Sequence, residues 1–138
     1  MMHKNKGFTL VEMMVVIVII GILAALGWPN YVRMKEMTLN REARATLALI
    51  RAAEKVYRME EGFYYPYLAA TSNTTNINNN LKLALPVGGT FSWAVSVDGA
   101  TGLGQATRLA TGTGDGRVWS LVFPGNADPT CAGGTYCP

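Results

Sequence analysis

The apolar residues of this chain follow three patterns, and the first is an uninterrupted run near its start. From Phe8 to Trp28 there are 21 residues, of which Glu12 alone is charged. An α-helix of this length spans roughly 30 Å, the thickness of the hydrocarbon core of a bilayer. The run therefore predicts a membrane-spanning helix. Because a lone ionised group inside such a helix is costly, Glu12 is a functional candidate.

The second pattern is amphipathic and begins after Pro29. Apolar residues that share one helical face recur there at steps of three and four: Leu39, Ala43, Leu47, Ile50, Ala53 and Tyr57. Gly62 is a natural stop, so we expect one helix over 8–61. Its local weak points are Gly21, Gly27 and Pro29, because glycine is a poor helix former and proline removes a hydrogen-bond donor.

The third pattern is typical of β-strands. Residues 62–89 are aromatic and then polar and turn-prone, so we expect a connecting loop there. Beyond it, apolar side chains alternate with small or polar ones at Phe91, Trp93, Val95 and Val97, and again at Trp119, Leu121 and Phe123. A weaker strand is expected over 105–111, between glycine-rich turns. The prediction is an α+β fold in which the long helix packs on a small antiparallel sheet of three to four strands, through its face of Leu47, Ile50 and Tyr57.

The start of the chain carries a specific resemblance. The run Gly7-Phe8-Thr9-Leu10-Val11-Glu12, followed by the apolar stretch, resembles the leader and stalk of type IV pilins and type II secretion pseudopilins. In that family a prepilin peptidase cuts after the glycine and methylates the new N-terminal amine. The resemblance implies cleavage between Gly7 and Phe8, N-methylation of Phe8, and an assembly role for Glu12 with Phe8. The family's helix-perturbing proline corresponds to Pro29, and its frequent upstream glycine to Gly21.

These features divide the chain into five segments. Residues 1–7 are the expected leader, 8–29 the transmembrane and assembly half of the helix, and 30–61 its amphipathic half. Residues 62–89 are the connecting loop, and 90–138 the antiparallel sheet with a C-terminal disulfide loop.

Charge indicates how the chain lies in a membrane. The formal charge is +3, and removing Lys4 and Lys6 with the leader leaves about +1 on the side chains. So weak a balance gives no case for nucleic-acid binding. By the positive-inside rule, Lys4 and Lys6 hold the N-terminus in the cytoplasm. Together with the resemblance, this orientation implies a single-pass protein of the bacterial inner membrane before assembly, and a periplasmic or extracellular filament afterwards.

Two cysteines, Cys131 and Cys137, lie beyond the membrane segment on the exported side. A reactive or metal-binding pair is one interpretation, but a structural zinc site normally needs four ligands. We favour a disulfide, because exported proteins meet an oxidising environment.

Catalysis has little support in the sequence. His3 is the single histidine and leaves with the leader, so no exported Ser-His or Cys-His pair can form. The glycine-rich run at 112–116 lacks the Lys-Ser/Thr of a phosphate loop. Asp115 and Asp128 are acidic loop residues of the kind that bind calcium, but two aspartates fall short of its six to eight oxygen ligands. We expect no enzyme activity, no cofactor and no resident metal.

Two classes of function remain. The first is a structural subunit, either a type IV pilin that forms a fimbrium or a type II secretion pseudopilin; the cysteine pair favours the pilin. The second is a non-assembling, membrane-anchored binding module. Glu12 argues for the first class, because an anchor needs no buried carboxylate. The partners then implied are identical subunits, a prepilin peptidase, an inner-membrane assembly platform and, before assembly, the membrane.

Overall fold

The computed structural model describes residues 7–87, 92–109 and 114–138. The chain divides into two compact units, and the first ends at Lys35 and the second begins at Glu36. The expected leader residues Lys4 and Lys6, Phe91 of the first expected strand and part of the glycine-rich turn lie outside the described residues.

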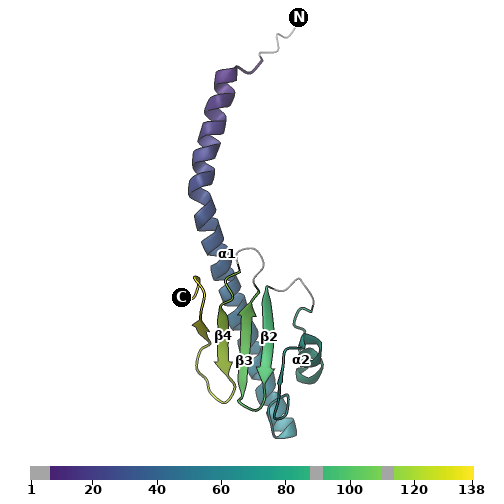
Figure 1. The fold of residues 1–138 in the computed structure, drawn as a ribbon. Helices are drawn as coiled ribbons and strands as arrows, with labels where there is room; N and C mark the ends of the chain where they lie inside the picture. Colours follow the sequence, from purple (N-terminus) through teal and green to yellow (C-terminus); the bar gives the residue numbers. More distant parts are fainter. Residues whose placement is uncertain (1–6, 88–91, 110–113) are drawn as a thin grey trace, which may run out of the picture. The chain divides into compact units, whose positions relative to one another are not determined.

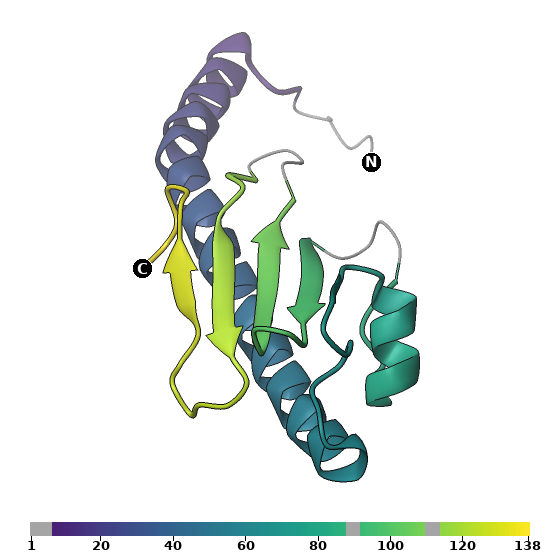
Figure 2. The same ribbon diagram turned by 60° about the horizontal axis from the view of Figure 1, so that its bottom comes forward.

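Helix α1 (Leu10–Glu61) is continuous over 52 residues and includes Pro29. It ends where the sequence predicts, because Gly62 has a φ of 87° and its amide donates to the carbonyl of Arg58. In the second unit, one face of α1 lies against the sheet (Figures 1 and 2). Its fully buried apolar residues are Ala43, Leu47 and Ile50, as the helical spacing predicts.

The sheet is antiparallel and has five strands in the order β1-β2-β3-β4-β5. Its strands are β1 (Ala70–Thr71), β2 (Trp93–Asp98), β3 (Leu103–Arg108), β4 (Val118–Val122) and β5 (Thr130–Ala132). The α+β class is confirmed. The sheet exceeds the three to four strands expected, because the short strands β1 and β5 pair at its two edges. The turn between β2 and β3 forms because Asp98 accepts hydrogen bonds from the amides of Ala100 and Thr101.

The core consists of two clusters between α1 and the sheet. The first gathers Ile50, Ile77, Leu81, Leu85, Val95, Val97 and Phe123. The second gathers Ala43, Leu47, Trp93, Ala106, Trp119 and Leu121. The alternation in β2 and β4 therefore points inward at Trp93, Val95 and Val97 and at Trp119 and Leu121, as expected.

The expectation of an unstructured connection over 62–89 is corrected by helix α2 (Thr74–Leu81). The side chain of Asn73 caps this helix by accepting from the amide of Asn76, at 3.1 Å. Ile77 and Leu81 lie four residues apart and are both buried. The asparagine-rich stretch thus forms a capped, amphipathic helix. The segment after it is held by the side chain of Asn78, which accepts from the amide of Leu85 and donates to its carbonyl.

A buried network of charged side chains joins α1 to the sheet. Glu36 is fully buried and accepts hydrogen bonds from Arg108, at 3.1 and 3.2 Å, and from Arg117, at 2.7 Å. Arg117 is also fully buried and donates to Asn40 at 2.7 Å and to Asp115 at 2.6 Å. Two carboxylates are therefore matched by two guanidinium groups, which offsets the cost of burying Glu36, Arg108 and Arg117.

The C-terminal loop completes this network. Cys131 and Cys137 form a disulfide, which confirms the expected pairing. Within the loop that it closes, the amides of Thr135 and Tyr136 donate to Asp115, and the carbonyl of Tyr136 accepts from Asn40 at 2.7 Å. Burial alone would raise the pKa of Asp115, but the hydrogen bonds from Arg117 and Tyr136 hold that pKa below its ordinary value.

The network predicts that Arg117→Met destabilises the body strongly. The substitution leaves Glu36 and Asp115 short of a buried partner, so we expect a loss of about 3–5 kcal/mol in the free energy of unfolding. Arg41→Met is the matched control, because Arg41 is an exposed arginine on α1, and it should change stability by no more than about 0.5 kcal/mol. Urea unfolding of the oxidised full chain measures both. Equal effects of the two substitutions would contradict a stabilising network.

The disulfide predicts a local effect on the same network. Replacing both cysteines, Cys131→Ser with Cys137→Ser, should cost about 2 kcal/mol on the chain-entropy model of a short loop. Hydrogen exchange should speed up at the amides of Thr135 and Tyr136 and stay unchanged in β3, which serves as the internal control. Unaltered protection of these two amides would show that the loop is held without its disulfide.

Candidate functional site

The first unit presents an apolar helix surface that its own residues leave uncovered. The large apolar side chains from Phe8 to Trp28 are each between 43% and 76% exposed. The first part of α1 is long and apolar enough to cross a membrane, with a mean hydropathy of 2.7 over its most apolar window. A contiguous apolar surface of this size marks a site of contact with lipid or with other proteins.

Glu12 lies at the start of this surface and belongs to a capping box. The amide and the hydroxyl of Thr9 donate to the Glu12 carboxylate, at 2.9 and 2.8 Å, and the amide of Glu12 donates to the Thr9 hydroxyl at 3.3 Å. Thr9 and Glu12 thereby satisfy backbone donors that the first helical turn cannot pair. The sequence contains the signal for this arrangement, a threonine followed three residues later by glutamate. The capping role was not predicted, because Glu12 was interpreted only as a functional carboxylate.

Phe8 directly precedes this capping box. It is 76% exposed, and it lies four residues before Glu12 in the chain. Gly7, the residue before the expected cleavage point, is exposed as well. The peptide bond between Gly7 and Phe8 thus lies just outside the helix, where the backbone has no regular structure that would hinder an enzyme.

The expected helix-perturbing residues lie inside a regular helix. Gly21 and Gly27 have no neighbouring atoms within 4 Å of a Cβ that would be added to them. Neither glycine is therefore required by packing within the described chain. Pro29 lacks an amide hydrogen, which leaves the carbonyl four residues earlier without its usual helical donor. Contacts within the single chain do not explain these three residues. That they perturb the helix in an assembly stays a prediction.

In the second unit, α1 carries an apolar row on the side away from the sheet. Its members are exposed and follow a spacing of four and three: Ala45, Leu49, Ala52, Val56 and Met59. The exposed fractions of Leu49, Val56 and Met59 are 49%, 50% and 79%. We call this set the outer row. Sequence reasoning missed it because the stronger periodicity of the inner face dominates the same segment.

The two acidic loop residues considered for calcium are separately engaged. Asp115 takes part in the buried network through Arg117. Asp128 is exposed and lies 4.0 Å from Arg44, a contact of little energetic weight. In the part of the chain that the structure describes, no three His, Cys, Asp or Glu side chains group together as a metal site would require.

Comparisons with known proteins agree with this geometry. Residues 2–28 match the family model described as the prokaryotic N-terminal methylation motif. The chain is 39% identical over 61 residues to the type IV major pilin protein PilA of Myxococcus xanthus, across 44% of this chain and 28% of that protein. It is 41% identical over 61 residues to the type II secretion system core protein G of Escherichia coli, across 44% of this chain and 42% of that protein. These alignments span less than half the length of either relative.

A third relative is similar over almost the whole chain. The fimbrial protein EcpC of Eikenella corrodens is 32% identical over 130 residues, which cover 90% of this chain and 85% of that protein. The relatives are pilins and pseudopilins, which are structural proteins and not enzymes, and the apolar helix fits membrane anchoring before assembly. By its methylation motif and by its extended similarity to a fimbrial protein, the chain belongs to the type IV pilin and pseudopilin family.

Proposed function

We propose that this protein is a structural subunit of a type IV pilus or a similar filament, and that it polymerises through α1 after residues 1–7 are removed. The observation that carries the proposal is the uncovered apolar surface from Phe8 to Trp28 with a single carboxylate at its start. Lipid covers such a surface before assembly, and the same helices of other subunits cover it afterwards. The five segments expected from the sequence then become leader, assembly helix, body helix, connection and sheet.

Cleavage supplies the charge that assembly needs. In the precursor the nitrogen of Phe8 is a neutral amide, whereas in the processed chain it becomes an amine that is protonated near neutral pH. When a subunit moves from lipid into a core of helices, its Glu12 carboxylate loses any access to water. The Phe8 amine of an adjacent subunit can reach the same depth and compensate the desolvation of both groups. The pair thereby sets the axial register of the filament.

Small residues allow the helices to approach closely. Gly21 and Gly27 have free space around their Cα atoms in the single chain, which suits contact with the backbone of a neighbouring helix. Pro29, which donates no helical hydrogen bond, marks where α1 can adjust its path in a filament. The outer row adds exposed apolar side chains in the second unit, where Leu49 and Val56 are each about half exposed. These side chains can contact neighbouring subunits as well.

A pseudopilin of a type II secretion system is the second candidate. It is favoured by the identity to several core proteins G, which is confined to 44–46% of this chain. The fimbrial relative matches 90% of the chain, and this supports the pilin. Deleting the gene in the native host separates the two candidates, because loss of surface filaments supports a pilin and loss of secreted enzymes supports a pseudopilin.

Processing makes the first prediction of this proposal. Mass spectrometry of the filament protein from the native host should show that residues 1–7 are absent and that the N-terminal Phe8 carries one added methyl group. Replacing the residue before the cut, Gly7→Leu, should block cleavage, because the family's peptidase cuts after a glycine. An intact leader on subunits within filaments would contradict the proposed maturation.

Glu12 makes the second prediction, and the capping box requires two variants to interpret it. Glu12→Leu removes both the charge and the cap, whereas Glu12→Gln keeps a capping side chain without the charge. If the intersubunit pair matters, both variants should be inserted and cleaved but should assemble poorly, because a buried amine without its partner costs about 3–5 kcal/mol. Filament yield by shearing and electron microscopy is compared with the amount of processed subunit in membranes.

The outcome distinguishes the two roles of Glu12. Abundant filaments from Glu12→Gln with few from Glu12→Leu would assign the residue to capping alone. Normal filaments built only of Glu12→Leu subunits would show that assembly does not need the carboxylate. That result would favour an anchored binding module.

A further inference from the structure

Glu54 is a second buried carboxylate of α1, and among the residues that the structure describes it forms no ion pair like those of Glu36. Its side chain is fully buried on the face that packs against the sheet. One carboxylate oxygen accepts a hydrogen bond from the amide of Tyr65 at 2.9 Å, and the other makes none within the described chain. The positive side chain one turn further along, Arg58, donates to the hydroxyl of Tyr64 instead. A charged carboxylate in this position is therefore poorly compensated.

The surroundings of Glu54 favour its neutral form. Tyr57, on the same helix, interacts electrostatically with Glu54, Glu61 and Tyr65, and none of these groups is a cation. Arg58, one turn beyond Glu54, is engaged by the hydroxyl of Tyr64. The other elements packed on this part of α1 contribute apolar side chains to the cluster: Ile77, Leu81, Val95, Val97 and Phe123. Burial raises the pKa of Glu54 from 4.5 to about 7, and the hydrogen bond from the Tyr65 amide offsets only part of this effect.

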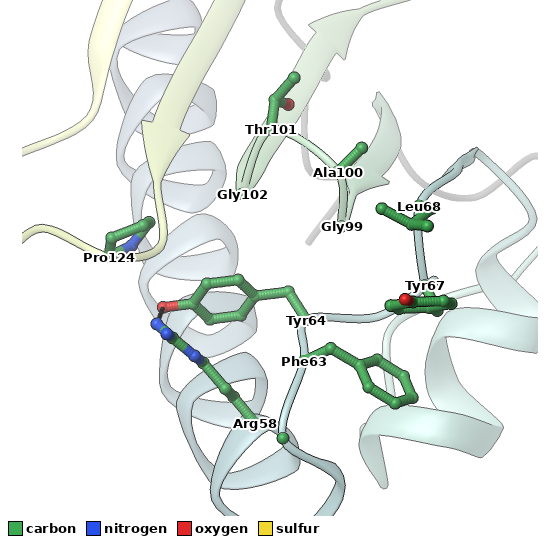
Figure 3. Close-up of a pocket in the computed structure, with 11 residues that line it drawn as sticks. Arg58, Phe63, Tyr64, Tyr67, Leu68, Gly99, Ala100, Thr101, Gly102 and Pro124 are labelled. Atoms are coloured by element: carbon green, nitrogen blue, oxygen red, sulfur yellow. Dashed lines mark hydrogen bonds between the residues drawn. The ribbon is translucent and has the colours of Figure 1, made fainter.

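Glu54 is also an anchor for the segment that follows α1. The segment 62–68 holds Phe63, Tyr64, Tyr67 and Leu68, which line a pocket of about 460 Å³ together with Arg58, the turn Gly99–Gly102 and Pro124 (Figure 3). The rings of Phe63 and Tyr67 lie 4.5 Å apart, and that of Tyr64 lies 5.5 Å from Phe123. Tyr65, whose amide Glu54 binds, is in the middle of this segment.

The segment depends on such anchors because its backbone is not in a relaxed conformation. Leu68 has a φ of 50°, in the left-handed region that residues with a side chain rarely adopt. Its side chain is nevertheless 70% exposed, so apolar burial does not hold it there. A residue in this state persists where surrounding contacts determine its conformation, and weakening one contact allows it to relax.

We propose that Glu54 is a proton-controlled latch: its neutral form holds the segment 62–68 and its aromatic pocket against the body, and its ionised form releases them as the pH rises. The proposal is independent of filament assembly, because it rests on contacts within one subunit.

The direction of the pH effect follows from linkage. In the unfolded chain Glu54 loses its proton near pH 4.5, and in the folded chain near pH 7. The folded state therefore binds this proton more tightly than the unfolded state does. The stabilisation is fully present below the unfolded value, declines as pH rises between the two values and is lost above the folded one.

The test uses the full chain in detergent, with Glu54→Gln as the variant that stays neutral at every pH. Glu60→Gln is the matched control, because Glu60 is an exposed glutamate on the same helix. In the wild type, the carboxyl carbon of Glu54 should titrate near pH 7 by NMR. After correction for the intrinsic exchange rate, protection of the Tyr65 amide should fall about tenfold or more between about pH 5 and pH 8.5. Glu60→Gln should behave in the same way.

In Glu54→Gln, protection of the Tyr65 amide should be independent of pH across this range. The variant should also be more resistant to unfolding than the wild type above about pH 8 and similar to it near pH 5. A carboxyl carbon of Glu54 that titrates near pH 4.5 would overturn the proposal, as would a pH-dependent loss of protection that persists in Glu54→Gln. Should the variant fail to fold, the titration and amide exchange of the wild type decide the question alone.

Discussion

The packing of one face of α1 against the sheet is the contact on which the body depends, and it takes polar as well as apolar groups out of water. The buried residues of the helix are Glu36, Asn40, Ala43, Leu47, Ile50 and Glu54. Half of this row is polar, although burying an unmatched polar group costs more than burying a methyl group gains. The arrangement of the sheet and of its loops therefore has to supply partners, as well as apolar surface, along the whole contact.

The body meets this requirement in two different ways. At Glu36 and Asn40 it brings in charge and hydrogen bonds: Arg108 from β3, Arg117 and Trp119 from the β4 region, and the carbonyl of Tyr136 from the disulfide loop. Such a network has directional bonds, and these fix the position of the C-terminal loop on the helix. At Glu54 the body supplies one amide donor in otherwise apolar and aromatic surroundings, and the burial of the carboxylate there favours its neutral form. The same helix face is thus rigidly specified near its start and responsive to pH near its end.

Much of this contact could be predicted from the sequence. The buried polar residues could not, because polar residues on a helix are usually assigned to the solvent-exposed surface. The inner apolar residues Leu47 and Ile50, the inward alternation of β2 and β4 and the disulfide all follow from spacing and context. Glu36, Asn40 and Glu54 continue the row of Ala43, Leu47 and Ile50 at steps of four and three. Arg108 and Arg117 alternate in phase with the buried Ala106 and Trp119. Charged residues in phase with a buried face carry a signal, but the usual interpretation as a solvated surface hides it.

Other parts could not be predicted because their cause is not local. Helix α2 depends on Ile77 and Leu81 finding the core, and an asparagine-rich stretch does not indicate this by composition. Strands β1 and β5 have two and three residues, which is too short for any periodicity. In the first unit Glu12 stood out as a lone carboxylate, and the family resemblance implied an assembly role that stays a prediction. Its local hydrogen bonds to Thr9 were not predicted.

Those hydrogen bonds change the energetic meaning of the proposed assembly. Because Thr9 already satisfies the Glu12 carboxylate in the single chain, an intersubunit pair with Phe8 gains only the difference between the two arrangements. The net driving force then has to come from covering apolar side chains that are between 43% and 76% exposed. The ion pair disfavours the wrong axial positions. A subunit out of register leaves an amine and a carboxylate unpaired in the helix core, and the free-energy cost of burying them unpaired is large. On this account apolar burial determines whether subunits associate, and Glu12 determines at which axial position they do so.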